Sequence, residues 1–181
     1  MGMPREKGPV VRVAALLSPA GEEPGPLLDS LEGLWGPLKS VSEPMDFRFT
    51  RFYEREMGPG LARRFLAFAD LAPAEGLRAW KRASNALESR LAVHGGRRAN
   101  VDPGYLDLGT VVVASVKDAA YRVYLGGGIY AQPMLYFETG GFRAWPWTYP
   151  DYAMRAAVEF FNAVRAGYRD AVRQGARAVS G

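Results

Sequence analysis

The segment from Asn100 to Tyr105 combines polar side chains with residues that bend a chain. It reads Asn-Val-Asp-Pro-Gly-Tyr, and Pro followed by Gly suits the two central positions of a type II turn. An Asp before them can accept a hydrogen bond from the backbone of the turn. Two interpretations are open: a purely structural turn, or a turn that presents Asn100 and Asp102 to a ligand.

A second polar group lies on the clearest helical pattern of the chain, which runs from Leu77 to Leu91. At 100° per residue, Lys81, Asn85 and Glu88 form one stripe beside the apolar face of this helix. Lys81 and Glu88 can form a salt bridge at the edge of the helix, with Asn85 beside it. Alternatively, the stripe faces the Asp102 turn and lines a polar pocket.

A third group lies in residues 53–64, which we expect to form a short loop bounded by Gly and Pro. It contains Tyr53, Glu56, Arg63 and Arg64. A carboxylate here can act as an acid or base, and a guanidinium can clamp an anion. A solvated charged loop is the alternative; the functional interpretation requires Glu56 and an arginine to converge with Asp102.

Together these groups predict a polar cleft for a small anionic or nucleotide-like ligand, with or without enzymatic activity. In this hypothesis Asp102 or Glu56 is the catalytic acid or base. The predicted ligand-binding residues are Tyr53, Lys81, Asn85, Arg97, Asn100, Lys117, Arg122, Tyr130 and Asp151. No metal site is predicted, because His94 is the only histidine and no spacing resembles a calcium loop. We expect His94 to cap a helix end, and the sequence identifies no cofactor.

Two further functions are compatible with the sequence. The aromatic residues Trp145, Trp147, Tyr149 and Tyr152 suit base stacking, and Arg165, Arg169, Arg173 and Arg177 repeat every four residues. Together they suggest an RNA-binding module, although aromatic residues also pack sheets against helices and arginine stripes are often solvated. The third candidate is an adaptor that binds a protein partner without catalysis, which would expose a large apolar patch.

Composition narrows the chemistry and the location. The chain has 181 residues, a net charge of +4 and no cysteine. The lack of cysteine excludes disulfides, thiolate zinc sites, iron–sulfur ligation and cysteine nucleophiles, and it suits a cytoplasmic protein. The apolar run from Val10 to Leu17 is too short to span a membrane, so we expect no membrane association.

Periodicity predicts an α+β fold in one domain, residues 1–181, with an ordered core of about residues 10–173. The simplest packing is a ferredoxin-like β-α-β-β-α-β half extended by an antiparallel β-meander and a C-terminal helix. Residues 65–68 fit a strand or a helical turn equally well. Thr148 and Asp151 have capping-box spacing at the start of the last helix. The expected strands are 10–17, 38–50, 110–116, 121–125, 129–138 and 142–147. The expected helices are 27–35, one that starts after Pro73 and ends before Gly95, and 150–173.

Four linked segments give the chain a family resemblance. They are residues 49–58 (FTRFYEREMG), 97–106 (RRANVDPGYL), 128–131 (GIYA) and 147–152 (WTYPDY). From about residue 10 to about residue 170 the chain resembles an uncharacterised bacterial family, domain of unknown function 4416. The resemblance implies no established activity. Some members are labelled GTP-binding, yet this chain has no Gly-x-x-x-x-Gly-Lys-Ser/Thr loop. Tyr121 stands where the family pattern leads us to expect histidine, and Gln132 where it leads us to expect glutamate, so no mechanism resting on those positions is carried over.

Overall fold

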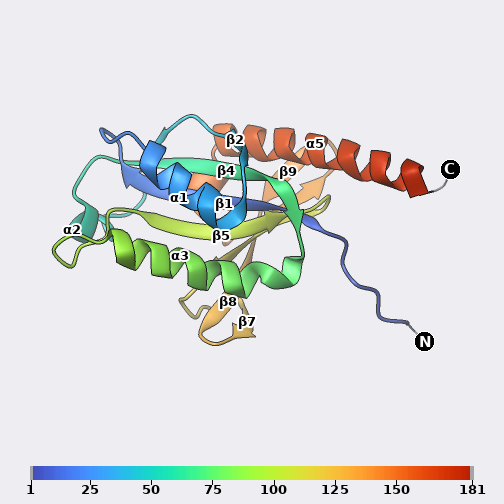
Figure 1. Ribbon diagram of the computed structural model, residues 1–181, viewed down its shortest axis with the longest axis horizontal. Coiled ribbons are helices and arrows are strands. Elements are labelled where there is room, and N and C mark those ends of the chain that lie inside the picture. The colour runs from blue at the N-terminus through green and yellow to red at the C-terminus, as the bar shows by residue number, and fades with distance from the viewer. Residues whose placement is uncertain (1, 180–181) are drawn as a thin grey trace.

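A computed structural model describes residues 2–179, and the side chains up to residue 174. The described residues form one antiparallel sheet of nine strands with helices on both faces (Figure 1). The elements are β1 (Val10–Pro19), α1 (Gly25–Trp35), β2 (Leu38–Val41), β3 (Met45–Asp46), α2 (Glu54–Met57), β4 (Leu61–Ala72), the 3-10 turn η1 (Ala74–Gly76), α3 (Leu77–Leu91), β5 (Asn100–Leu106), β6 (Thr110–Ser115), β7 (Val123–Gly126), β8 (Ile129–Glu138), β9 (Gly141–Ala144), α4 (Pro150–Ala153) and α5 (Arg155–Val179).

The strand order confirms the α+β class. It runs β2-β4-β1-β5-β6-β8-β7, while β3 pairs with β4 and β9 pairs with β8. The four neighbouring strands β2, β4, β1 and β5, with α1 and α3 as connections, are compatible with the expected ferredoxin-like half. The remaining strands are antiparallel as expected, but β7 lies outside β8 and not between β6 and β8. No helix in the described part of the chain is long and apolar enough to cross a membrane.

Alternation along the strands divides the core into two layers, because successive side chains of a strand point to opposite faces. On β1, Ala14 and Leu16 pack in the layer that contains Leu31 of α1 and Leu87 of α3. Val13 and Ala15 pack in the other layer, with Phe161 of α5. The sheet is therefore covered on both faces, as Figure 1 shows.

The region expected as a charged loop differs from the prediction. Residues 65–68 belong to the twelve-residue strand β4, which begins at Leu61 and therefore includes Arg63 and Arg64. Only the part before Gly58 is helical, as the single turn α2. A strand forms because β4 pairs with β1 on one side and with β2 and β3 on the other. Pairing with distant residues decided what local periodicity left open.

The last helix starts differently from the expected capping box, which is wrong. Tyr149 is the N-cap of α4, and Met154 has an extended backbone that separates α4 from α5. The Thr148 hydroxyl accepts the Trp145 N–H at 2.8 Å and donates to the Met134 carbonyl. The Asp151 carboxylate accepts a hydrogen bond from Arg63 of β4.

His94 does not cap α3, which ends at Leu91. It lies in a two-residue turn that joins Val93 to Gly96 by two backbone hydrogen bonds of 3.0 Å. His94 and Gly95 both have positive φ, 50° and 79°, as a tight hairpin turn requires. Its imidazole is exposed.

Candidate functional site

The segment predicted as a type II turn is a strand, β5, that opens on one side. Asn100 to Leu106 pair with β1 along their whole length, but only Gly104 to Leu106 pair with β6. Pro103 has no N–H to donate to a neighbouring strand, so the β5–β6 ladder ends there. The turn prediction is wrong because the pairing with β1 holds the Pro-Gly pair extended.

Glycine is needed at position 104, where β5 begins to pair with β6. A Cβ atom built on Gly104 would lie 2.3 Å from the backbone oxygen of Val112 on β6. No side chain fits at this distance, so β6 can approach β5 only at a glycine. Three consecutive residues therefore have different roles. Asp102 provides a carboxylate, Pro103 ends the pairing of β5 with β6, and Gly104 lets the two strands approach closely.

Side chains of α3 replace the missing strand at the open half of β5. Lys81 Nζ donates to the Val101 carbonyl at 2.9 Å and to Asp102 Oδ1 at 2.8 Å. Glu88 Oε1 accepts the Val101 N–H at 2.8 Å. The stripe of α3 thus faces the Asp102 segment, which was one of the two interpretations, and Lys81 pairs with Asp102 instead of Glu88.

A chain of polar contacts joins Asp102 to Glu56, as the functional interpretation required. Asn100 Nδ2 donates to Asp102 Oδ2 at 2.9 Å, and Arg97 Nη1 donates to Asn100 Oδ1 at 3.2 Å. Arg97 holds Glu56 through two hydrogen bonds of 2.6 and 3.0 Å. Arg97 links α2 to the start of β5, with Glu56 on the solvent side.

A buried ion pair lies on the α5 face of the same region. Arg63 Nε of β4 donates to Asp151 Oδ2 of α4 at 2.8 Å, and the two side chains are only 4% and 3% exposed. The guanidinium also lies 5.0 Å from the centre of the Phe47 ring. Arg63 Nη1 is buried and has no hydrogen-bond partner among the described residues.

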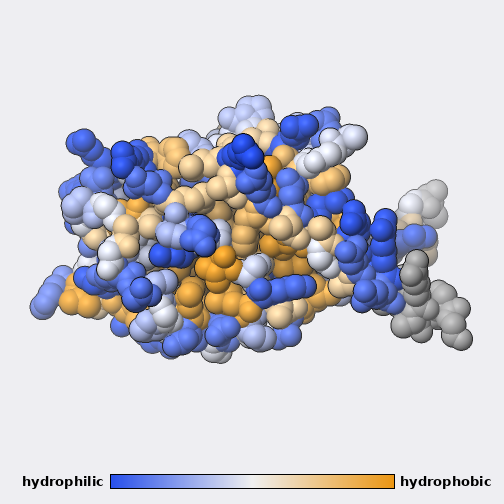
Figure 2. All heavy atoms as spheres, turned by 90° about the horizontal axis from the view of Figure 1, so that it is seen from above, coloured by the Kyte–Doolittle hydropathy of each residue, from blue (hydrophilic) through white to orange (hydrophobic). Residues whose placement is uncertain are grey.

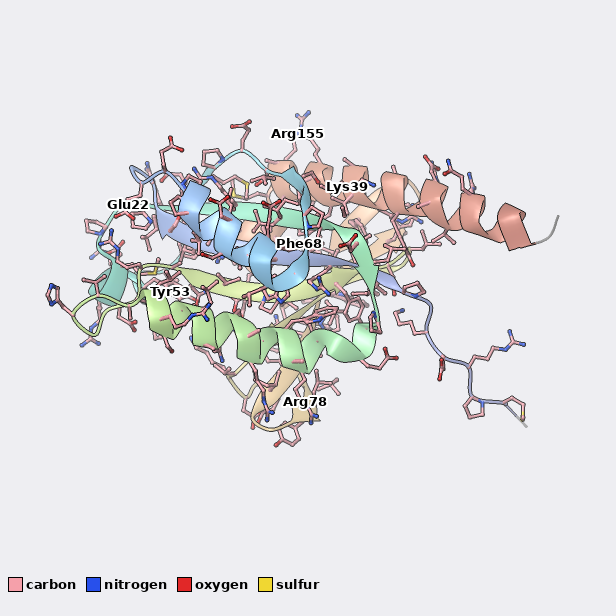
Figure 3. The ribbon with its side chains drawn as sticks, viewed as in Figure 1. Glu22, Lys39, Tyr53, Phe68, Arg78 and Arg155 are labelled. Carbon is pink, nitrogen blue, oxygen red and sulfur yellow. The ribbon has the colours of Figure 1, made fainter. Side chains whose placement is uncertain are left out.

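All of these polar side chains except Glu56 line one cavity of about 620 Å³, a size typical of small-molecule sites. Four aromatic side chains from residues 47–53, directly before α2, form one wall of the cavity. Neighbouring rings of this wall contact edge to face. Figure 3 shows Tyr53 of this wall labelled beside one end of α3. Lys117 lies 4.0 Å from the centre of the exposed Phe52 ring. The wall consists of Phe47, Phe49, Phe52 and Tyr53.

The structure brings most predicted site residues to this cavity, but not all of them. The lining includes Tyr53, Lys81, Asn85, Arg97, Asn100, Asp102, Lys117 and Asp151. Glu56 is outside the lining and contacts it through Arg97. Tyr130 is also outside and packs against Tyr124, with ring centres 5.1 Å apart.

Arg122 is outside the cavity and holds two of its lining residues by hydrogen bonds. Its guanidinium donates to Gln132 at 2.7 Å, to the Ser115 hydroxyl at 2.8 Å and to the Tyr149 hydroxyl. Ser115 and Tyr149 line the cavity, whereas Arg122 does not. Tyr121, the other position that departs from the expected family pattern, stacks on Trp147 at 6.1 Å between ring centres.

The carboxyl groups of the site differ in their proton affinity. Burial alone would raise the pKa of Asp102, but the charges of Lys81 and Arg63 and the hydrogen bonds from Lys81 and Asn100 together outweigh it, and the pKa is lowered. The hydrogen bonds from Arg97 lower the pKa of Glu56. Burial raises the pKa of Glu88, and the charge of Lys81 opposes this only in part. Asp102 and Glu56 are thus suited to accept hydrogen bonds as carboxylates, and Glu88 is better suited to proton transfer.

Several residues that line the cavity were not among the predicted ligand-binding residues. Glu88 was on the stripe that we expected either to form a salt bridge or to line a polar pocket, but it was not among the predicted ligand-binding residues. Arg63 was expected in a loop, although its place within an apolar run signalled a strand. Phe47 and Phe49 fitted a period-two pattern, but nothing in that pattern indicated that they would line a cavity.

The proposed RNA-binding features make contacts within the protein. The Trp145 and Trp147 rings stack on one another with centres 5.2 Å apart. Arg165 donates to the Leu108 carbonyl at 2.7 Å and covers the Phe137 ring, and the Arg177 side chain lies outside the described residues. RNA binding stays a prediction. Among residues 2–179, no cluster of three or more acidic, histidine or cysteine side chains is placed to hold a metal.

Comparison with known families decides the resemblance noted in the sequence. The sequence model of the family described as "Domain of unknown function (DUF4416)" matches residues 9–168. The chain belongs to this family. No match was found among curated proteins or among solved structures. Membership supplies no activity, so the function has to be argued from the cavity itself.

Proposed function

We propose that the protein binds a small anionic ligand in the cavity between α3, the open half of β5 and α4. The observation that carries this proposal is Arg63, a cavity-lining guanidinium whose Nη1 is buried without a partner among the described residues. A buried N–H of a charged group that makes no hydrogen bond is costly. An anionic oxygen is the acceptor that matches it best.

The remaining free groups of the lining support the same proposal. Lys117 has an aromatic neighbour but no carboxylate partner among the described residues, and the Asn85 side chain lines the cavity beside Lys81. The aromatic wall offers contact area for a planar group. A ligand with an anion at one end and a ring at the other, which includes nucleotide-like molecules, fits these features.

We further propose that Asp102 and Glu56 position cations and do not themselves transfer protons. Asp102 fixes Lys81, and Glu56 fixes Arg97, so each carboxylate is committed to a cation. A cytoplasmic location and a single-domain organisation stay predictions.

Filling the cavity tests the proposal. Asn85→Trp adds a large side chain to the lining, and Ala86→Trp adds the same bulk at the exposed neighbouring position of α3. Benzoate and phenyl phosphate serve as anionic probes, and binding is measured by calorimetry and by the rise in melting temperature. We expect at least one probe to bind the wild type and Ala86→Trp, with affinity at least tenfold weaker in Asn85→Trp. Equal binding by both variants, or no binding of either probe to the wild type, would contradict the proposal.

A further inference from the structure

The charges around the cavity bear on which anion it accepts. Four cationic side chains, Arg63, Lys81, Arg97 and Lys117, line the cavity, and four carboxylates contact them or share the lining: Glu56, Glu88, Asp102 and Asp151. When all are ionised, the site has no net positive charge. A dianionic ligand would therefore bring one more negative charge than a monoanionic ligand beside these carboxylates, and like charges in such surroundings repel strongly.

Most of the cations are already neutralised by partners in the protein. Lys81 is 2.8 Å from Asp102, Arg63 is 2.8 Å from Asp151 and Arg97 is 2.6 Å from Glu56. Lys117 is the lining cation without a carboxylate partner in the described chain. One negative charge on a ligand can therefore be paired with Lys117, and a second negative charge finds no unpaired cation in the lining.

The nitrogen atoms of Arg63 that make no hydrogen bond determine which shape of anionic group fits. Its Nε is used by Asp151, so the terminal nitrogens form the part of the planar group that remains for a ligand. A carboxylate is flat and can lie in the plane of a guanidinium. Phe47 lies against the same guanidinium at 5.0 Å and continues the aromatic wall, which places a ring next to the anion-binding group.

We propose that the ligand is an aromatic monocarboxylate, with its carboxylate on Arg63 and its ring against Phe47 and the aromatic wall. This assignment rests on the proposed anion-binding function and narrows it. It favours a carboxylate over a phosphate ester of the same ring, because the phosphate ester is mostly dianionic above pH 7.

A matched series of probes tests the assignment on the full chain at pH 7.5. Benzoate, phenyl phosphate and benzyl alcohol share one ring and differ in charge, and their affinities are compared by calorimetry. We expect benzoate to bind at least tenfold more tightly than phenyl phosphate, and benzyl alcohol to show no measurable binding. If phenyl phosphate binds as well as benzoate and Asn85→Trp blocks both, the anion site stands and the monocarboxylate assignment is overturned. If benzyl alcohol matches benzoate, or if no probe binds, both proposals fail.

Two variants on one strand identify the anion-binding group. Arg63→Lys keeps the charge but removes the planar guanidinium, and Arg64→Lys makes the same change at the next residue. Arg64 pairs with Leu16, which faces the opposite layer of the core. We expect Arg63→Lys to weaken benzoate binding tenfold or more and Arg64→Lys to leave it unchanged; equal affinities for the two would overturn the assignment.

Arginine side-chain NMR on the wild type gives a result even if Arg63→Lys does not fold. Saturating benzoate is expected to shift the guanidinium signals of Arg63 and to leave those of Arg64 in place. An Arg63 signal that does not respond to bound benzoate would overturn the assignment.

Discussion

The two halves of β5 satisfy their backbone in different ways. From Gly104 to Leu106 the strand lies between β1 and β6 and belongs to an ordinary sheet. From Asn100 to Pro103 it keeps β1, but α3 supplies the partners on the other side. There the Val101 carbonyl and N–H are bound by Lys81 and Glu88.

This difference explains why a polar cavity forms where it does. Strand-to-strand hydrogen bonds are complete in themselves, whereas charged side chains that replace a strand need charged partners of their own. Lys81 accordingly meets Asp102, and Arg97 stands near Glu88, with 3.8 Å between Nη1 and Oε2. Because β5 stops pairing with β6 at Gly104, charged side chains gather beside the unpaired half of β5. These side chains form part of the cavity wall.

The largest expected effect comes from breaking the open half. Lys81→Met leaves the Asp102 carboxylate without its cation and the Val101 carbonyl without its donor. We expect the free energy of unfolding to fall by at most about 3–5 kcal/mol, the usual cost of removing one partner of a buried pair, because Lys81 is 4% exposed and Asp102 is 24% exposed. Urea denaturation measures it, with the exposed Lys39→Met as control.

A double variant shows whether the loss arises from the pair. In Lys81→Met/Asp102→Asn the stranded charge is gone, so the destabilisation should be smaller than the sum of the two single changes. Strictly additive losses would show that Lys81 stabilises the fold without acting through Asp102.

A smaller effect is expected from disturbing the closed half. Gly104→Ala places a methyl group 2.3 Å from the Val112 oxygen, and β6 has to move away. We expect a loss of about 2–3 kcal/mol, in the upper range for overpacking, measured by the same denaturation. Gly109→Ala is the matched control, because its added atom would meet only Asp107 at 3.7 Å. Equal stability of the two variants would show that β5 and β6 can separate at little cost.

The smallest expected effect concerns acid stability. The pKa of Asp102 is lower in the folded protein than its ordinary value of 3.8, so ionised Asp102 stabilises the fold above about pH 4. This contribution is lost as the pH falls through the lowered folded pKa. Stability between pH 6 and pH 2 should therefore decline less steeply in Asp102→Asn than in the wild type. Asp29→Asn, an exposed change on α1, should keep the wild-type slope; a wild-type slope in Asp102→Asn as well would contradict the prediction.

The sequence predicted the elements with strong periodicity. The helix expected between Pro73 and Gly95 is confirmed as an element, because its apolar residues repeat at helical spacing and a Gly-Gly pair follows it. Its ends at Leu77 and Leu91 lie a few residues inside those limits. Its polar stripe also faces Asp102. These features depend on local order and on one helix face, which a sequence displays directly.

Features set by distant partners could not be predicted in the same way. Pro103 and Gly104 have turn chemistry in isolation, and only the pairing of β5 with β1 makes them a strand. The Arg63–Asp151 pair joins residues 88 positions apart, so neither residue carries a local sign of the other. The capping-box spacing of Thr148 and Asp151 was misleading because both side chains bind elsewhere.

The outer borders of the sheet have a consequence for the protein at high concentration. The long strand β4 is covered by β2 and β3 one after the other, and β8 is covered in the same way by β7 and β9. Each border is therefore made of strands of two to four residues. Apolar side chains do reach the surface, as Figure 2 shows from above, but short border strands offer little continuous backbone for another molecule to pair with. Edge-to-edge aggregation is disfavoured by the way the sheet ends.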